Sequence, residues 1–174
     1  TGFDGVYDVV TSGTADIAIA QVRFNPLRTQ EVLYTRPYYN AGLVLVTPVS
    51  SPIHTITDLG GKVVAFAFGS ESDTELTRWS RRVSLFERAP YELPAYALDA
   101  VRLGTADAAL VHATSAGIYQ RNNPDWPMHI IHAITVDPFS IIVDRRNDVL
   151  WKHVDEALSE ILDSGELQMI LNDW

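Results

Sequence analysis

The sequence predicts an α/β fold built from two similar halves. The tetrapeptide Gly-Thr-Ala-Asp occurs at residues 13–16 and again at 104–107, each time after a helix-like stretch and before a short apolar run. Glycine tolerates the left-handed conformation that ends many helices, so each copy predicts a helix, a polar turn and a buried strand. Further strand and helix patterns fill the rest of the 174 residues.

The other elements follow from apolar periodicity and from the positions of glycine and proline. We expect strands at 16–20, 63–68, 108–111 and 129–135, extended chain at 32–48 and 138–143, and helices at 96–103, 114–121 and from 148 onward. A further helix opens over 69–75, where Ser70 and Asp73 have the spacing of a capping box. The polar stretch 21–30 contains Pro26 and is predicted to be a loop at the end of the first strand, where open α/β sheets bind ligands.

Composition and charge exclude several classes of function. The chain has 13 basic and 22 acidic residues and a net charge of -9, which repels nucleic acids and anionic membrane surfaces. It has no cysteine, so disulfides and thiolate metal sites are absent. No run approaches the roughly 20 apolar residues that span a bilayer. Because the first helix pattern has no strand before it, we expect an N-terminal portion to lie outside this sequence.

The histidines and carboxylates show no catalytic or metal-binding pattern. His-Glu-x-x-His, Gly-x-Ser-x-Gly and phosphate-binding glycine loops are all absent. His129 and His132 lie in a predicted strand at a spacing that directs them to opposite faces. We therefore expect no metal, no cofactor and no catalytic residue.

Several motifs, in a fixed order, resemble one known family. They are Ser-Gly-Thr-Ala-Asp at 12–16, Asn-Pro-Leu-Arg at 25–28, Tyr-Thr-Arg-Pro-Tyr-Tyr at 34–39, Asp-Leu-Gly-Gly-Lys-Val at 58–63, Phe-Gly-Ser at 68–70 and the Gly165 to Trp174 ending. The chain thereby resembles the solute-binding proteins of ABC uptake systems, in the branch that binds polar amino acids. The resemblance covers nearly the whole sequence, without the opening strand, helix and strand of the family.

The resemblance implies a type II periplasmic binding protein fold, with two lobes joined by hinge strands and a first lobe that is incomplete here. Residues 1–40 and 141–174 would form the first lobe, and 41–140 the second lobe with the hinge crossings at both ends. In this family, one lobe closes on the other to trap the ligand.

Ligand-binding candidates come from the loop 21–30 and from two positions further along. Arg28 matches the family arginine that grips a ligand carboxylate, and the planar guanidinium fork suits that role. Ser70 matches a family hydroxyl at a helix N-terminus, with Glu71 beside it. The remaining candidates in the loop are Gln21, Arg23, Phe24 and Asn25. A solvated arginine, a plain N-cap serine and ordinary loop packing are the alternatives for these residues.

Two departures from the family pattern concern the charge of the ligand. Arg23 stands where serine or threonine is usual, and His112 stands where an aspartate normally neutralises the ligand ammonium group. Together with Arg28 they favour a more anionic ligand, or one without an amino group. An ordinary half-buried histidine is the alternative for His112.

The resemblance predicts capture of a small carboxylate-bearing solute, an amino acid or related organic acid, for an ABC permease. We expect a periplasmic or extracellular protein, either free or anchored to the membrane through a segment outside this sequence, and a homodimer formed through an exposed sheet edge. Two alternatives stay open: the input domain of a membrane signalling receptor, and a dehydratase-like enzyme on the same fold.

Overall fold

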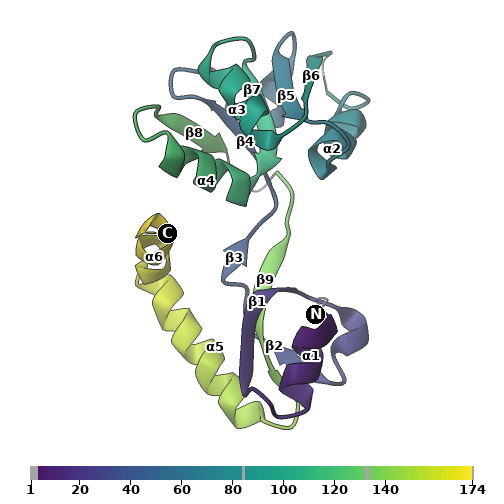
Figure 1. Cartoon of the computed structure of the whole chain (residues 1–174), viewed down its shortest axis with the longest axis vertical. Helices are drawn as coiled ribbons and strands as arrows, with labels where there is room; N and C mark the ends of the chain where they lie inside the picture. The colour runs from purple at the N-terminus through teal and green to yellow at the C-terminus, as the bar shows by residue number, and fades with distance from the viewer. Residues whose placement is uncertain (1–3, 84, 132–133, 174) are drawn as a thin grey trace. The chain divides into compact units, whose positions relative to one another are not determined.

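The computed structural model describes residues 4–83, 85–131 and 134–173. The chain divides into two compact units, one formed by Thr1–Asn40 and Asp137–Trp174 (unit 1) and the other by Ala41–Val136 (unit 2). Each unit has its own sheet and its own helices (Figure 1). Within the described residues no helix is long and apolar enough to cross a membrane.

Unit 1 is organised around one central strand, β9 (Pro138–Asp144), which pairs antiparallel with three others. The sheet order is β1-β9-β2, and β3 also pairs with β9. The other elements are α1 (Asp4–Thr11), β1 (Ile17–Arg23), the 3-10 turn η1 (Pro26–Arg28), β2 (Val32–Tyr34), β3 (Tyr39–Asn40), α5 (Asp148–Asp163) and α6 (Glu166–Asp173).

The core of unit 1 is small. Helix α1 buries Tyr7 and Val10 against Val22, Val32 and Ile142, which come from β1, β2 and β9. Tyr7 and Val10 lie three residues apart and therefore on the same face of α1, where they pack against the three strand residues. One apolar face thus joins the helix to the sheet. Helix α5 contacts β9 and β2.

Unit 2 contains a five-stranded mixed sheet in the order β6-β5-β7-β4-β8. β5 is parallel to β6 and β7, whereas β4 is antiparallel to β7 and β8. Its elements are β4 (Leu43–Pro48), η2 (Ile56–Leu59), β5 (Val63–Ala67), α2 (Glu71–Trp79), β6 (Glu87–Tyr91), α3 (Pro94–Arg102), β7 (Ala108–His112), α4 (Ala113–Asn122) and β8 (Met128–Ile131).

Both faces of this sheet are covered, and its central strands are accordingly apolar at nearly every position. On one face Val44, Val46 and Ala109 pack with Leu98 and Tyr119 of α3 and α4. On the other face alternate residues of the same strands pack with α2 and with the segment before β5. Strands with two buried faces read as continuous apolar runs in the sequence, as 43–46 and 108–111 do.

Three elements differ from the sequence predictions. The strand expected at 129–135 is β8, which ends at Ile131; residues 132 and 133 lie outside the described residues, and 134 and 135 form a bend. β6 was not predicted, because Pro90 interrupts its pattern; proline is tolerated there because β6 lies at the edge of the sheet. β1 was predicted as a buried strand ending at residue 20, but it extends to Arg23, and most of its side chains are exposed or half-buried. It lies at the edge of its own sheet, so it has fewer neighbours to cover it.

Candidate functional site

The loop after β1 begins with an irregularity in the strand itself. The antiparallel register with β9 shifts between Ala18 and Val22, and Gln21 adopts a positive φ of 55°. A non-glycine residue in this conformation is uncommon, and such positions cluster where a bulge redirects the chain. The bulge precedes the segment that carries Arg23, Phe24, Asn25 and Arg28.

Arg28 lies at the end of η1, where it contacts Tyr7 and Glu31. Asn25 begins the turn, and its side-chain oxygen accepts a hydrogen bond of 3.0 Å from the backbone N–H of Leu27. The Arg28 guanidinium lies 5.1 Å from the centre of the Tyr7 ring, and its Nη1 donates to Glu31 Oε2 at 2.8 Å. The side chain is 27% exposed, so the stacked and paired guanidinium still reaches solvent.

Tyrosine and phenylalanine rings line this same segment. The Tyr34 hydroxyl lies 3.2 Å from the Tyr7 hydroxyl and accepts a hydrogen bond of 3.3 Å from the Asn25 backbone N–H. Phe24 packs edge-on against Tyr34, with ring centroids 5.1 Å apart, yet it remains 58% exposed. Arg28 is therefore stacked on one ring, that of Tyr7, and Tyr7 is in turn linked through Tyr34 to Phe24.

Arg23, like Arg28, is paired with a carboxylate of unit 1. Its Nε and Nη2 donate to the two carboxylate oxygens of Asp137 at 2.6 and 2.7 Å. Its guanidinium also lies 5.5 Å from the centre of the Phe139 ring. A bidentate pair of this kind satisfies the charge of the arginine, so Arg23 adds little positive potential to its surroundings.

In unit 2, the sequence from Gly69 forms the turn into α2. Gly69 has a φ of 71°, which a side-chain-bearing residue rarely adopts. The predicted capping box is absent: the Ser70 hydroxyl donates to the Ala67 carbonyl at 2.6 Å and makes no capping bond. The Asp73 carboxylate reaches instead to the backbone N–H of Gly69, at 2.9 Å.

Arg88 on β6 holds Asp73 in this position. Its Nη2 donates to Asp73 Oδ1 and, at 3.3 Å, to the Asp73 backbone carbonyl. Its guanidinium lies 4.9 Å from the centre of the Phe66 ring. A chain of contacts therefore runs from the sheet through Asp73 to the glycine turn, and sequence patterns gave no sign of it because Arg88 lies in the strand that was not predicted.

His112 ends β7 and faces the start of α2. Its Nδ1 lies 3.2 Å from the Ala41 carbonyl oxygen, and its Nε2 lies 3.7 Å from Glu71 Oε2. A carbonyl can only accept, so this contact places a proton on Nδ1. The Glu71 side chain is 52% exposed and supplies the carboxylate nearest to His112 Nε2.

Over its whole length, residues 1–174, the chain matches the family described as bacterial extracellular solute-binding proteins, family 3. The chain belongs to this family. Membership places the protein in the periplasm or outside the cell.

Named relatives and a solved structure agree with this family. The arginine-binding extracellular protein ArtP of Bacillus subtilis (strain 168) is 24% identical over 173 residues, which are 99% of this chain and 68% of ArtP. The L-cystine-binding protein TcyJ of Escherichia coli (strain K12) is 25% identical over 177 residues, which cover 100% of this chain and 65% of TcyJ. A polar amino acid ABC uptake transporter substrate binding protein from Streptococcus thermophilus has a TM-score of 0.84 at 22% identity, covering 100% of this chain and 68% of that one.

These findings confirm the type II periplasmic binding protein fold expected from the sequence. The chain spans only 65% to 68% of the length of the two relatives. The ligands named for these longer proteins are therefore a basis for a proposal about this chain.

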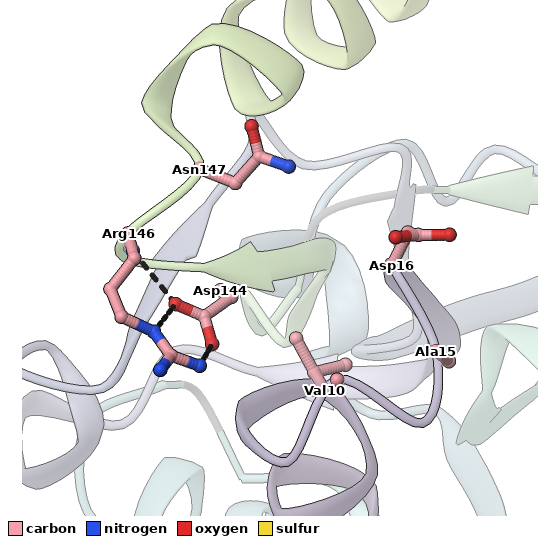
Figure 2. Close-up of a pocket in the computed structure, with 7 residues that line it drawn as sticks. Val10, Ala15, Asp16, Asp144, Arg146 and Asn147 are labelled. Carbon is pink, nitrogen blue, oxygen red and sulfur yellow. Dashed lines mark hydrogen bonds and ion pairs between the residues drawn. The ribbon is translucent and has the colours of Figure 1, made fainter.

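A pocket in unit 1 is lined by none of the predicted ligand-binding residues. It is lined by Val10, Gly13, Ala15, Asp16, Asp144, Arg146 and Asn147 (Figure 2). β1 pairs with β9 so that Ile17 lies opposite Val143 and Arg23 opposite Phe139, which puts the pocket and Arg23 at opposite ends of the sheet.

The main polar contact in the pocket is internal. Arg146 donates from Nε and Nη2 to the two oxygens of Asp144, at 2.9 and 2.6 Å, and from its backbone N–H at 2.7 Å. These bonds lower the pKa of the Asp144 carboxyl to about 2. A second bond from Arg146 Nη2 to the Thr11 carbonyl, at 2.8 Å, ties the segment after β9 to the end of α1, so the pair has a structural role.

Proposed function

We propose that the chain captures an amino acid and presents it to an ABC permease. The observation that carries the proposal is the Arg28 guanidinium, which is stacked on Tyr7 and partly exposed in the loop after β1 of a family 3 solute-binding protein. ArtP and TcyJ, which are named for arginine and cystine, support an amino acid as the ligand.

The arginine is suited to a carboxylate because its planar fork can donate two parallel hydrogen bonds. The hydrogen bond from Arg28 to Glu31 is made by Nη1, and the Glu31 side chain is itself 41% exposed. The Arg28 guanidinium is already stacked on the Tyr7 ring before a ligand binds. Binding a carboxylate therefore costs less side-chain entropy, which favours affinity.

Two observations favour a ligand with an ammonium group over a purely anionic one. The charge of Arg23, which was expected to attract anions, is matched by Asp137. Glu71 brings a half-exposed carboxylate to 3.7 Å from His112 Nε2. We propose that Glu71 and His112 together determine which ligand charge unit 2 accepts, with Ser70, Gln21, Phe24 and Asn25 as further candidates for contact.

Isothermal titration with arginine, histidine, glutamine, cystine, succinate and glutarate tests the proposal. We expect at least one amino acid to bind and Arg28→Ala to weaken it by about 2–5 kcal/mol, the usual cost of removing one partner of a buried charge pair. Arg28→Lys keeps the charge without the fork and should bind with intermediate affinity. Lys152→Ala is the matched control, because it removes a cation from an exposed position of α5 in the same unit.

Binding of dicarboxylates alone would overturn the assignment of amino acids, and equal binding by wild type and Arg28→Ala would overturn the role of Arg28. Recovery of the ligand unchanged after incubation is expected for a binding protein, since the family consists of solute-binding proteins. A new product would instead support the dehydratase alternative.

We also propose that unit 1 pairs with a second copy through β1. This strand lies at the sheet edge in the described part of the chain, and Ile19 on it is 60% exposed. Unpaired edges with apolar side chains favour strand addition. Light scattering after size exclusion is expected to give twice the chain mass, and Ile19→Lys to give the monomer; a wild-type monomer refutes the pairing.

A further inference from the structure

Two histidines that are 75 positions apart in the sequence come together on the surface of unit 2. The rings of His54 and His129 have centroids 6.3 Å apart and an interplanar angle of 63°. Both residues are exposed. We propose that His54 and His129 form a binding site for a divalent transition-metal ion.

The backbone at both histidines is held by hydrogen bonds, so the pair is pre-organised. His129 lies on β8, the edge strand next to β4, in register with Thr47. His54 precedes η2, and its backbone N–H donates to Asp58 Oδ2 at 2.9 Å, as does the N–H of Thr55. The hydrogen bonds of the strand and of the turn fix the backbone positions of the two histidines, while their exposed imidazole rings can still rotate.

The distance between the rings fits a shared ion after a small rotation. With metal–nitrogen bonds of about 2.1 Å and a tetrahedral angle, two coordinating imidazoles have centroids about 5 Å apart. The observed 6.3 Å is wider than this, so the two exposed rings rotate toward each other when they share an ion. In the part of the chain that the structure describes, neither imidazole hydrogen-bonds to another residue, so coordination breaks no existing contact.

The chemistry of the pair selects the kind of ion. Imidazole nitrogen suits Zn²⁺, Cu²⁺ and Ni²⁺, whereas Mg²⁺ and Ca²⁺ require oxygen ligands. Among the described residues no group of three or more His, Cys, Asp or Glu is placed to hold a metal, so water completes the coordination.

A bound ion would join the edge strand to the turn before η2. Because an ion that binds only the folded state raises its stability, binding should increase the thermal midpoint of the protein. The sequence spacing could not reveal this pair, since the two histidines belong to no short metal motif.

The test is titration of ZnCl₂ into untagged, chelator-treated protein, followed by calorimetry and by thermal unfolding. We expect one ion per chain and a raised midpoint, and a loss of affinity of tenfold or more in His54→Ala and in His129→Ala. His153→Ala is the matched control, because His153 is an exposed histidine of α5 that lies 3.9 Å from Glu156 on the same helix.

The single variants must retain the wild-type thermal midpoint without metal, which shows that the fold is intact. Unchanged zinc affinity in His54→Ala or His129→Ala, or an equal loss in His153→Ala, overturns the site. Equal binding of Mg²⁺ overturns the assignment to imidazole ligands.

Discussion

Replacing Arg88 by methionine tests how the glycine turn before α2 is held. The change removes the pair with Asp73 and the contact of the guanidinium with the Phe66 ring, while the methionine keeps much of the side-chain stem. Asp73 then keeps its bond to the Gly69 N–H but loses the partner that orients its carboxylate. We expect both a loss of stability and a looser turn.

The size of the loss follows from the contacts. A hydrogen bond to a charged group contributes about 1.5–3 kcal/mol, and the low end applies because the side chains of Arg88 and Asp73 are 31% and 20% exposed. The ring contact adds about 0.5–1 kcal/mol. Arg88 Nε is buried without a hydrogen-bond partner among the described residues, so its removal returns about 1 kcal/mol. The expected net destabilisation is about 1–1.5 kcal/mol, or about 2–6 °C in the thermal midpoint.

Urea unfolding followed by circular dichroism measures this loss. Arg78→Met is the matched control: Arg78 pairs with Glu75 within α2, its side chain is 56% exposed, and we expect a change below about 0.5 kcal/mol. Hydrogen exchange at Gly69 and Ser70 should accelerate in Arg88→Met and in Asp73→Asn, and much less in Arg88→Lys. An Arg88→Met protein as stable as wild type, with unchanged exchange at Gly69, would refute the reasoning.

Two further predictions concern the boundary of unit 2 and the acid range. Gly42→Ala would place a Cβ 2.0 Å from the Thr135 carbonyl oxygen, so we expect about 1–3 kcal/mol of destabilisation in urea unfolding; wild-type stability would show that this backbone yields easily. Asp144 has its native pKa lowered to about 2 by Arg146, below the roughly 3.9 of an unfolded aspartate. Its stabilising contribution is therefore complete above pH about 4 and is lost as the pH falls through about 2. Asp144→Asn should be less stable at pH 7, and its difference from wild type should shrink towards pH 2; a constant difference across that range contradicts this linkage.

The fold was predictable wherever local patterns agree with tertiary position. The apolar runs at 43–46, 63–67 and 108–111 form central strands because both of their faces are covered. The edge strands gave weaker signals. β6 contains Pro90 and two charged residues, which a central strand would not accept, and β1 exposes Ile19.

The candidate site was predictable in its loop residues but not in their partners. Proline, asparagine and arginine at 25–28 indicate a turn ending in a cation, and the turn η1 forms there. The pairing of Arg23 with Asp137 joins residues 114 positions apart, and no local pattern encodes such a contact. That pairing changes the electrostatic interpretation of Arg23, so the ligand charge inferred from the sequence depended on a contact that only the structure reveals.

The two Gly-Thr-Ala-Asp copies show where local sequence stops determining structure. Gly13 and Gly104 have φ values of 76° and 75°, and each copy closes its helix with the same hydrogen bonds: the glycine N–H reaches back three residues, the threonine N–H five and the alanine N–H six. The aspartates then differ. Asp107 accepts from the Val63 N–H at 2.8 Å and joins β5 to β7, whereas Asp16 lines the pocket of unit 1. Identical residues give identical turns because the helix-ending geometry is local. The strand that follows is buried in β7 and largely uncovered in β1 because burial depends on the neighbours that the rest of the chain supplies.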